Sequence, residues 1–250
     1  MNTMENNKIQ IYITSWFRPD MLKKTIGYII ERTTPETYLI NVYDNGSDKA
    51  TTDMLYQYLE AGTINSLVLD KRNTGCLYNK LVFHSMVEST DKYYCVTDND
   101  VYPPKLSPDW LSRMIDIMER HPKIGLLTPQ LPPQCLQMPY KVEDEVIYAH
   151  AVGNTFKLVR KACLDSVVMD LPQKIGSYGD DGIVSGLIRA KGWDVAFCKD
   201  IFCFHAGQCD KWGYTEDQVS MDPRKIGYGK PFTYDIVNEE TYEPEPRYRM

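Results

Sequence analysis

The chain has 250 residues, enough for one large α/β domain with an ordinary hydrophobic core. Hydrophobic residues make up 43% and charged residues 25%, a globular composition that excludes disorder along the whole chain. With 28 Lys and Arg against 34 Asp and Glu, the formal net charge is -6. No basic excess therefore indicates a nucleic-acid-binding protein.

Membrane segments and disulfides are not indicated by the sequence either. No apolar run approaches the roughly 20 residues that cross a bilayer. The polar stretch Met1–Gln10 lacks the apolar core of a signal peptide. The seven cysteines are odd in number and scattered, which suits reduced thiols better than a disulfide framework. These features predict a cytoplasmic protein without a transmembrane segment.

Strand and helix patterns alternate along the first half of the chain. Runs of β-branched and apolar residues predict strands, and apolar residues at helical spacing predict helices. In chain order the predicted elements are strand Ile9–Thr14, a helix that begins at Pro19, strand Tyr38–Tyr43, a helix over about Thr51–Glu60, strand Ser66–Leu69, a helix from Gly75, strand Tyr93–Thr97, helix Trp110–Arg120 and strand Ile124–Thr128.

The second half is less regular. Its predicted segments are the irregular proline-rich stretch Pro129–Pro139, the extended stretch Ile147–Val159, helix Gly182–Lys191 and strand Trp193–Cys198. The charged, proline-spaced segment Glu239–Met250 predicts a loosely held tail. We therefore expect one domain over residues 1–215 and a C-terminal extension over residues 216–250.

Polar clusters follow four of the predicted strands. They are Ser15–Arg18, Asp44–Ser47, Arg72–Gly75 and Asp98–Asp100. Strands separated by helices imply right-handed crossovers and a mostly parallel sheet. Because ligands of such sheets bind at the carboxyl ends of the strands, the four clusters predict one ligand-binding rim.

Asp98-Asn99-Asp100 is the first candidate for chemistry. Two carboxylates one residue apart at a strand end can bind a hard divalent cation, which prefers oxygen ligands. Such a cation often completes its coordination with phosphate oxygens. The alternative is a solvated turn, in which Asp and Asn make local hydrogen bonds.

The acidic pair Asp180-Asp181 is the second candidate. Adjacent acidic residues at a helix start are typical of N-terminal capping. The functional alternative is a general base beside a substrate hydroxyl.

Two further residues have a structural and a functional interpretation. Asp44 precedes an Asn-Gly turn, where it is expected to be exposed and could accept a hydrogen bond from a nucleobase. His205 is interpreted as a hydrogen-bonded structural residue or as a metal ligand. With Cys198, Cys203 and Cys209 it could form a zinc site, although their spacing matches no standard zinc motif.

These pieces occur in an order that resembles the GT-A fold nucleotide-sugar glycosyltransferases, and within them the inverting glycosyltransferase family 2. The resemblance covers about residues 8–207 and rests on the ordered set rather than on any single motif. The motifs are Thr14–Arg18, Asp44–Ser47, Asn73–Gly75 with Asn79, Asp98–Asp100, Gly153–Phe156, Asp180-Asp181, Arg189–Trp193 and His205–Gly207. The resemblance implies an α/β GT-A (Rossmann-like) fold, with a mostly parallel central sheet flanked by helices.

The resemblance also implies an activity and residue roles. A nucleoside-diphosphate sugar, preferably a UDP-sugar, would donate its sugar with inversion to a hydroxyl, preferably on a glycan. The implied donor-binding residues are Thr14, Ser15, Trp16, Arg18, Asp44, Asn45, Arg72, Asn73, Gly75, Asn79, Asp98 and Asn99. Asp100, Asp98 and His205 would bind Mn²⁺ or Mg²⁺. Asp181 would be the general base with Asp180 supporting it, although the family commonly has Glu-Asp where this chain has Asp-Asp.

Two other functions compete with this interpretation. Haloacid-dehalogenase-like phosphatases also place Asp-x-Asp at a strand end, and Gly179–Asp181 resembles their later acidic loop. Their nucleophile lies on the first strand, however, whereas two strand–helix units precede Asp98 here. The other alternative is a catalytically inactive module that binds sugar nucleotides on the same fold.

Overall fold

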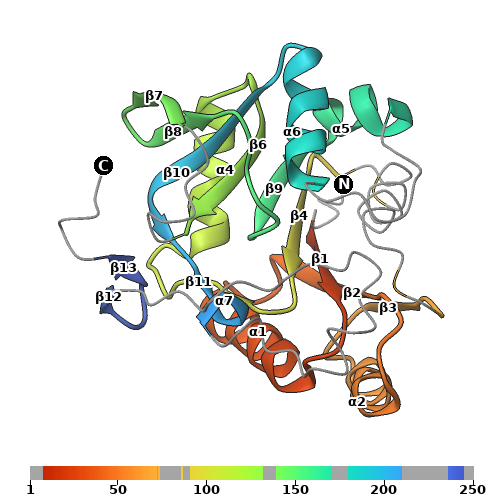
Figure 1. Ribbon diagram of the computed structural model, residues 1–250. Coiled ribbons are helices and arrows are strands. Elements are labelled where there is room, and N and C mark those ends of the chain that lie inside the picture. Colours follow the sequence, from red (N-terminus) through yellow and green to blue (C-terminus); the bar gives the residue numbers. More distant parts are fainter. Residues whose placement is uncertain are drawn as a thin grey trace, which may run out of the picture.

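The computed structural model describes residues 8–71, 73, 86, 91–131, 139–170, 180–209 and 236–244 (Figure 1). Its helices are α1 (Pro19–Arg32), α2 (Lys49–Glu60), α4 (Trp110–Arg120), α5 (Lys161–Val167), α6 (Asp180–Ala190) and α7 (Ala206–Cys209). Its strands are β1 (Ile9–Ser15), β2 (Tyr38–Asp44), β3 (Ser66–Leu69), β4 (Tyr93–Asp98), β5 (Val101–Tyr102), β6 (Ile124–Gln130), β7 (Pro139–Glu143), β8 (Val146–Ala149), β9 (Lys157–Arg160), β10 (Asp194–Phe202), β11 (Phe204–His205), β12 (Ile236–Asn238) and β13 (Glu243–Pro244).

A nine-stranded sheet in the order β3-β2-β1-β4-β9-β6-β10-β8-β7 forms the centre of the protein (Figure 1). Strands β3, β2, β1 and β4 pair in parallel, as do β6 and β10. β9 and β8 are antiparallel to the strands on both sides of them, and the other seven strands of this sheet share one direction. The predicted α/β class with a mostly parallel sheet is therefore confirmed.

The register of the parallel strands brings the predicted rim together. β1 lies between β2 and β4, with Ser15 opposite Asp44 and Thr14 opposite Asp98. The carboxyl ends of these three strands are consequently level with one another. Side chains that leave these ends can share one site although they are far apart in the sequence.

Helices cover both faces of the sheet because successive strand residues point to opposite sides. In β4, Tyr93 and Cys95 belong to one hydrophobic cluster, together with buried residues of α1, α2 and α4. Tyr94 and Val96 belong to a second cluster, with residues of α5 and α6. Both faces of the central strands are thus buried, which explains why these strands are almost continuously apolar.

Two predicted segments differ from the structure. The proline-rich stretch is not irregular throughout, because its first residues belong to β6 and Pro139 begins β7. The predicted strand Ile147–Val159 is two strands, β8 and β9, that pair with different neighbours. Phe156 just before β9 has a left-handed φ of 52°, which breaks the extended run. The predicted helix from Gly75 lies outside the described residues except for Met86.

Residues 236–244 are packed against the domain, so the prediction of a loose tail was wrong for Glu239–Pro244. β12 and β13 form an antiparallel pair. Between them, the hydroxyl of Tyr242 accepts a hydrogen bond from Arg32 Nη1 at 2.8 Å, and its ring stacks on Phe204 with centroids 5.4 Å apart. The backbone N–H of Lys105 also donates to the carbonyl of Glu240 at 2.8 Å. No helix in the described part of the chain is long and apolar enough to span a membrane.

Asp109 caps the N-terminus of α4. Its Oδ1 accepts backbone hydrogen bonds from Leu111 and Ser112 at 3.0 and 3.1 Å. Its Oδ2 accepts from the hydroxyls of Thr34 and Ser112 at 2.6 and 2.8 Å. Burial raises the pKa of Asp109, but these hydrogen bonds outweigh burial, so the net pKa is below its ordinary value of 3.8.

Replacing Asp109 with Ala is expected to lower the free energy of unfolding by about 0.5–2 kcal/mol. Because the folded-state pKa is depressed, this stabilisation is present above the ordinary pKa and is lost as pH falls through the folded pKa. Urea unfolding of wild type and Asp109→Ala at about pH 7 and about pH 3 measures the difference, which should shrink in acid. Asp109→Asn keeps a capping acceptor and should retain most of the stability at neutral pH. An Asn variant as unstable as the Ala variant would contradict the capping role.

Candidate active site

Asp98, the last residue of β4, is held by neighbours on both sides. Its Oδ1 accepts hydrogen bonds from Thr14 Oγ1 at 2.7 Å and from Asn154 Nδ2 at 3.0 Å. Burial raises the pKa of Asp98, the carboxylates of Asp100 and Asp181 raise it further, and the two hydrogen bonds only partly oppose this. Asn154, which binds Asp98, follows Gly153, and a Cβ atom on Gly153 would lie 4.0 Å from Asp181 Oδ2, so the two acidic motifs lie in the same region.

The turn after β2 is organised by Asp44 and Ser47. Asp44 Oδ1 accepts from the Ser47 backbone N–H at 2.8 Å, and Oδ2 accepts from the Ser47 hydroxyl at 2.5 Å. The Ser47 hydroxyl oxygen accepts in turn from the Phe17 backbone N–H at 2.7 Å, which ties the β2 turn to the segment after β1. Asp44 is 0% exposed, so the expectation of an exposed turn residue was wrong. Burial raises its pKa more than the hydrogen bonds from Ser47 lower it.

A buried ion pair joins the segment after β1 to the segment after β4. Phe17 and Arg18 both have left-handed φ angles, 52° and 59°, which turn the chain sharply before α1. Arg18 Nη1 forms an ion pair with Asp100 Oδ2, and Arg18 Nη2 donates to Asn99 Oδ1 at 2.6 Å. Asn99 Nδ2 returns a hydrogen bond to the carbonyl of Phe17 at 2.9 Å. Only 7% of the Arg18 side chain and 2% of the Asp100 side chain are exposed.

His205 also contacts Asp100. β11 pairs with β5, and the Ala206 backbone N–H donates to the Asp100 carbonyl at 2.8 Å. This pairing places His205 Nε2 3.2 Å from Asp100 Oδ2. Burial raises the pKa of Asp100, but the Arg18 charge and the hydrogen-bond contacts with Arg18 and His205 outweigh it and hold the pKa well below its ordinary value. The acid is therefore ionised at neutral pH.

Gly207 is required by this packing. A Cβ atom at this position would lie 2.0 Å from Asp100 Oδ2 and 2.7 Å from Arg18 Nη1. Any side chain at position 207 would therefore displace the ion pair. Glycine allows the α7 backbone to contact the carboxylate directly.

Asp100 and His205 fit a site for a hard divalent cation. Asp100 Oδ1 is buried without a hydrogen-bond partner, and Oδ2 lies 3.2 Å from His205 Nε2. Neighbouring ligand atoms of an octahedral ion with bonds of about 2.1 Å are roughly 3 Å apart, which this separation matches. The described residues contain no group of three or more His, Cys, Asp and Glu side chains that could hold a metal. Further ligands would therefore have to come from a bound diphosphate or water.

The cysteines do not favour the zinc alternative. Cys198 and Cys203 are buried in the hydrophobic core. Burial raises the pKa of the Cys198 thiol well above its ordinary value, which favours the neutral thiol over the thiolate that zinc requires. The side chain of Cys209 lies outside the described part of the chain.

Asp181, in the first turn of α6, is paired with a lysine from β9. Asp181 Oδ1 lies 3.2 Å from Lys157 Nζ. The Lys157 side chain is 0% exposed, whereas that of Asp181 is 32% exposed. A Cβ atom on Gly153 would lie 4.0 Å from Asp181 Oδ2, so the missing side chain at Gly153 leaves space beside the carboxylate. Asp181 can consequently be reached by a hydroxyl group while it remains paired.

The other predicted donor-binding residues are only partly placed. Ser15 is buried at the end of β1. Trp16 is also buried and packs edge-to-face on Phe17 with ring centroids 5.2 Å apart. Asn45 Nδ2 donates to Asn73 Oδ1 at 2.9 Å, which links the β2 turn to the segment after β3. Arg72, Gly75 and Asn79, and the side chain of Asp180, lie outside the described residues.

Three residues at this site were not assigned roles from the sequence. Asn154 orients Asp98, and its place in the Gly153–Phe156 motif was the available signal. Lys157 pairs with Asp181, but β9 contains two charged residues, Lys157 and Arg160, so no signal in the sequence singled out Lys157. Gly207 provides room for Asp100, and only its place after His205 pointed to it.

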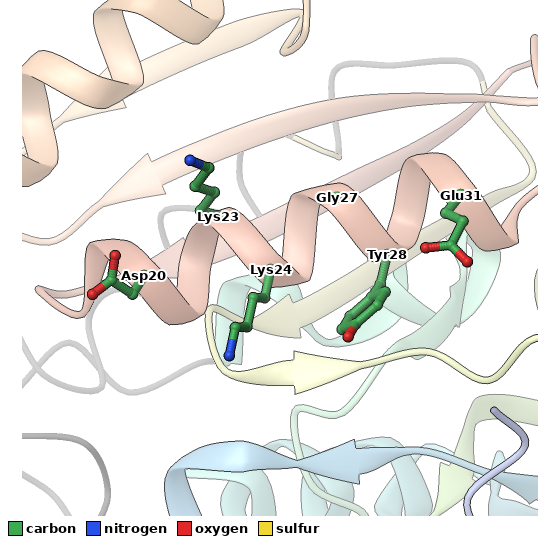
Figure 2. A pocket seen from close by; sticks show the side chains of 6 residues that line it. All are labelled: Asp20, Lys23, Lys24, Gly27, Tyr28 and Glu31. Carbon is green, nitrogen blue, oxygen red and sulfur yellow. The ribbon is translucent and has the colours of Figure 1, made fainter. Parts of the chain in front are cut away.

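A separate pocket lies on α1 and has a different character (Figure 2). It is lined by Asp20, Lys23, Lys24, Gly27, Tyr28 and Glu31. The lysines, the carboxylates and the tyrosine all come from this one helix (Figure 2). None of the predicted site residues lines it, so the pocket is not part of the candidate active site.

Asp44→Ala is expected to lower both stability and nucleotide affinity. Loss of the carboxylate removes the acceptor of two buried hydrogen bonds from Ser47, which should cost about 1–3 kcal/mol of unfolding free energy. If Asp44 binds the nucleobase, affinity should also fall by about 1.5–3 kcal/mol, the value of one charge-assisted hydrogen bond. Urea unfolding and nucleotide titration of the folded variant measure the two effects. Ser47→Ala is the control, because it removes the hydroxyl contacts with Asp44 and Phe17 but keeps the Asp44 carboxylate, and equal nucleotide affinity in Asp44→Ala and Ser47→Ala would sink the nucleobase role.

A sequence model described as glycosyl transferase family 2 matches residues 10–139 of the chain. The match is 130 of 250 residues, slightly more than half, and it includes β1, β2, β4 and Asp98–Asp100. No curated protein matches the chain.

Solved structures share the fold at low identity. GalNAc-T7 with UDP, GalNAc and Mn²⁺ has a TM-score of 0.62 and 13% identity, over 81% of this chain and 44% of that one. The mannosyltransferase PcManGT from Pyrobaculum calidifontis, in complex with GDP-Man and Mn²⁺, has a TM-score of 0.62 and 14% identity, over 80% and 56%. S. aureus TarS 1–349 in complex with UDP-GlcNAc has a TM-score of 0.58 and 13% identity, over 78% and 57%. The chain thus spans about half the length of these proteins, and the expected GT-A fold is confirmed.

Proposed function

The chain belongs to glycosyl transferase family 2, and from this premise we propose that it transfers a sugar from a nucleoside-diphosphate sugar to an acceptor hydroxyl. The observation that carries the proposal is the placement of Asp98, Asp100 and Asp181 at one edge of the sheet, where Asn154 binds Asp98 and the adjacent Gly153 lies against Asp181. Asp100 offers an ionised carboxylate near His205, and Asp181 offers a partly exposed carboxylate. A transfer reaction needs both, one to bind the donor and one to activate the acceptor.

The preferred donor is a UDP-sugar. Two of the similar structures contain UDP or UDP-GlcNAc, and the third contains GDP-Man. The proposed donor site consists of the segment after β1, the Asp44 turn and Asp98. The preferred acceptor is a glycan hydroxyl.

The proposed cation is Mn²⁺ or Mg²⁺, held by Asp100 and His205, because the described residues do not group Asp98 with them as a third ligand. Mn²⁺ is present in two of the similar structures. A bound divalent cation would supply the positive charge that stabilises the departing nucleoside diphosphate. Asp100 suits this role because its pKa is held low, so the carboxylate is charged whenever a cation arrives.

Asp181 is the proposed general base. It accepts the proton of the acceptor hydroxyl while the hydroxyl oxygen bonds to the anomeric carbon of the sugar. The bond from that carbon to the donor phosphate oxygen breaks in the same step, and the configuration inverts. Lys157 keeps the Asp181 carboxylate in place through the 3.2 Å contact. No protein nucleophile is needed, which also distinguishes this reaction from that of the phosphatase alternative.

Thermal denaturation with a panel of nucleoside diphosphates, each with and without Mn²⁺, tests the donor site. Ligand at about 100 times its Kd should stabilise the native protein by roughly 2.7 kcal/mol and raise Tm. We expect the largest rise with UDP and Mn²⁺ together. The proposal fails if no nucleotide raises Tm with any divalent ion. Release of free UDP from UDP-sugars in the presence of glycan acceptors then separates an active enzyme from an inactive binding module.

A further inference from the structure

Arg18 and a divalent cation would compete for the same oxygen atom. The Arg18 guanidinium pairs with Asp100 Oδ2, the atom that lies 3.2 Å from His205 Nε2. Gly207 lies against the same pair, and a Cβ there would contact both Asp100 Oδ2 and Arg18 Nη1. The space around this oxygen is therefore closely filled by the protein's own groups.

The charges at this site balance without an added ion. Asp100 is buried and ionised, and Arg18 is a buried cation held in two places, by Asp100 and by Asn99. A divalent cation that joined both of them would leave excess positive charge in a poorly solvated region, which is unfavourable. A diphosphate that arrived with the cation would supply the missing negative charge. The guanidinium fork also matches phosphate oxygens as well as it matches a carboxylate.

We propose that Arg18 competes with the divalent cation for Asp100, and that it releases Asp100 to the cation only when a nucleoside diphosphate offers the guanidinium another anion. The inference rests on the proposed function for its nucleotide. It makes cation and donor binding mutually dependent, because each ligand favours the arrangement that the other needs. The cation alone should bind weakly, and the nucleotide should strengthen its binding.

Titration of the full chain with Mn²⁺ alone tests the competition directly. Free Mn²⁺ is measured by its electron paramagnetic resonance signal, with no nucleotide and no turnover. Arg18→Gln removes the competing charge, so Asp100 is always available to the cation. We therefore expect the Kd for Mn²⁺ to fall by about tenfold. Added UDP should strengthen Mn²⁺ binding in wild type much more than in Arg18→Gln.

Two controls make the result specific. Lys24→Gln removes the same charge from the exposed face of α1, in the pocket of Figure 2, and should bind Mn²⁺ as wild type does. The double variant Arg18→Gln with Asp100→Asn should lose the gain, because the carboxylate for which the two cations compete is gone. If Arg18→Gln does not fold, Arg18→Lys should show a smaller gain, because an ammonium cannot hold Asp100 and Asn99 as a fork.

The proposal is overturned if Arg18→Gln binds Mn²⁺ no more tightly than wild type. It is also overturned if the gain persists without the Asp100 carboxylate or appears equally in Lys24→Gln. These outcomes are separate from failure of the proposed function. A protein that binds no nucleotide at all would refute the donor site, while the nucleotide-free Mn²⁺ titrations would still decide the role of Arg18.

Discussion

Asp181→Asn is expected to lower kcat by about 10²–10⁴-fold, the usual contribution of a positioned general base. The substitution preserves the shape of the side chain and removes its basicity. A sugar hydroxyl is a weak nucleophile, so its proton must be accepted during attack. Asp181 is suited to this because its carboxylate is 32% exposed and is held by Lys157. The donor KM should change little, because Asp181 is not among the residues proposed to bind the nucleotide.

Asp180→Asn is the matched control for this prediction. It removes the same charge from the adjacent position of α6 and should lower kcat less. If the acidic pair only caps the helix, both variants should lower Tm and leave the kcat of the folded fraction nearly unchanged. Near-normal turnover by folded Asp181→Asn would therefore falsify the assignment of the base and favour the capping role.

Asp100→Asn is expected to abolish the part of the nucleotide-induced rise in Tm that depends on Mn²⁺. It should also destabilise the protein without any ligand, by about 3–5 kcal/mol, because the partner of a buried guanidinium is neutralised. The two effects are measured separately, as the Tm increment from Mn²⁺ with UDP and as the Tm of the variant alone.

Asn99→Ala is a useful comparison for Asp100→Asn. It removes the other acceptor of the Arg18 guanidinium, and with it the hydrogen bond to Phe17, but keeps the Asp100 carboxylate. We expect Asn99→Ala to lower the ligand-free Tm and to retain the increment from Mn²⁺. A normal Mn²⁺-dependent increment in folded Asp100→Asn would remove Asp100 from the proposed cation site.

The predictable part of the fold is the part that follows local patterns. β1 and β2 were predicted within about one residue, and α1 was predicted at its first residue, because buried strands are continuously apolar and α1 begins at a proline. The break between β8 and β9 was missed because it depends on the left-handed φ of Phe156, which no side-chain pattern indicates. The packing of residues 239–244 was missed because Tyr242 contacts Arg32, far away in the sequence.

The candidate site divides in a similar way. The polar clusters after β1, β2 and β4 were predicted to meet at one rim, because parallel strands align their carboxyl ends, and their register supports this. The burial of Asp44 could not be predicted, since it depends on Ser47 linking two separate turns. The ion pair of Arg18 with Asp100 depends on two consecutive left-handed residues after β1, for which the sequence has no glycine to serve as a signal.

The contact between Arg32 and Tyr242 has a practical consequence for anyone who shortens this chain for expression. Residue 215 is the natural place to cut from sequence alone, yet a cut there removes Tyr242. Arg32 is only 9% exposed, and its Nη1 would keep the Pro103 carbonyl but lose the Tyr242 hydroxyl. Phe204, next to His205, would lose the ring that stacks on it. Versions of the protein made for binding assays should therefore retain residues 236–244.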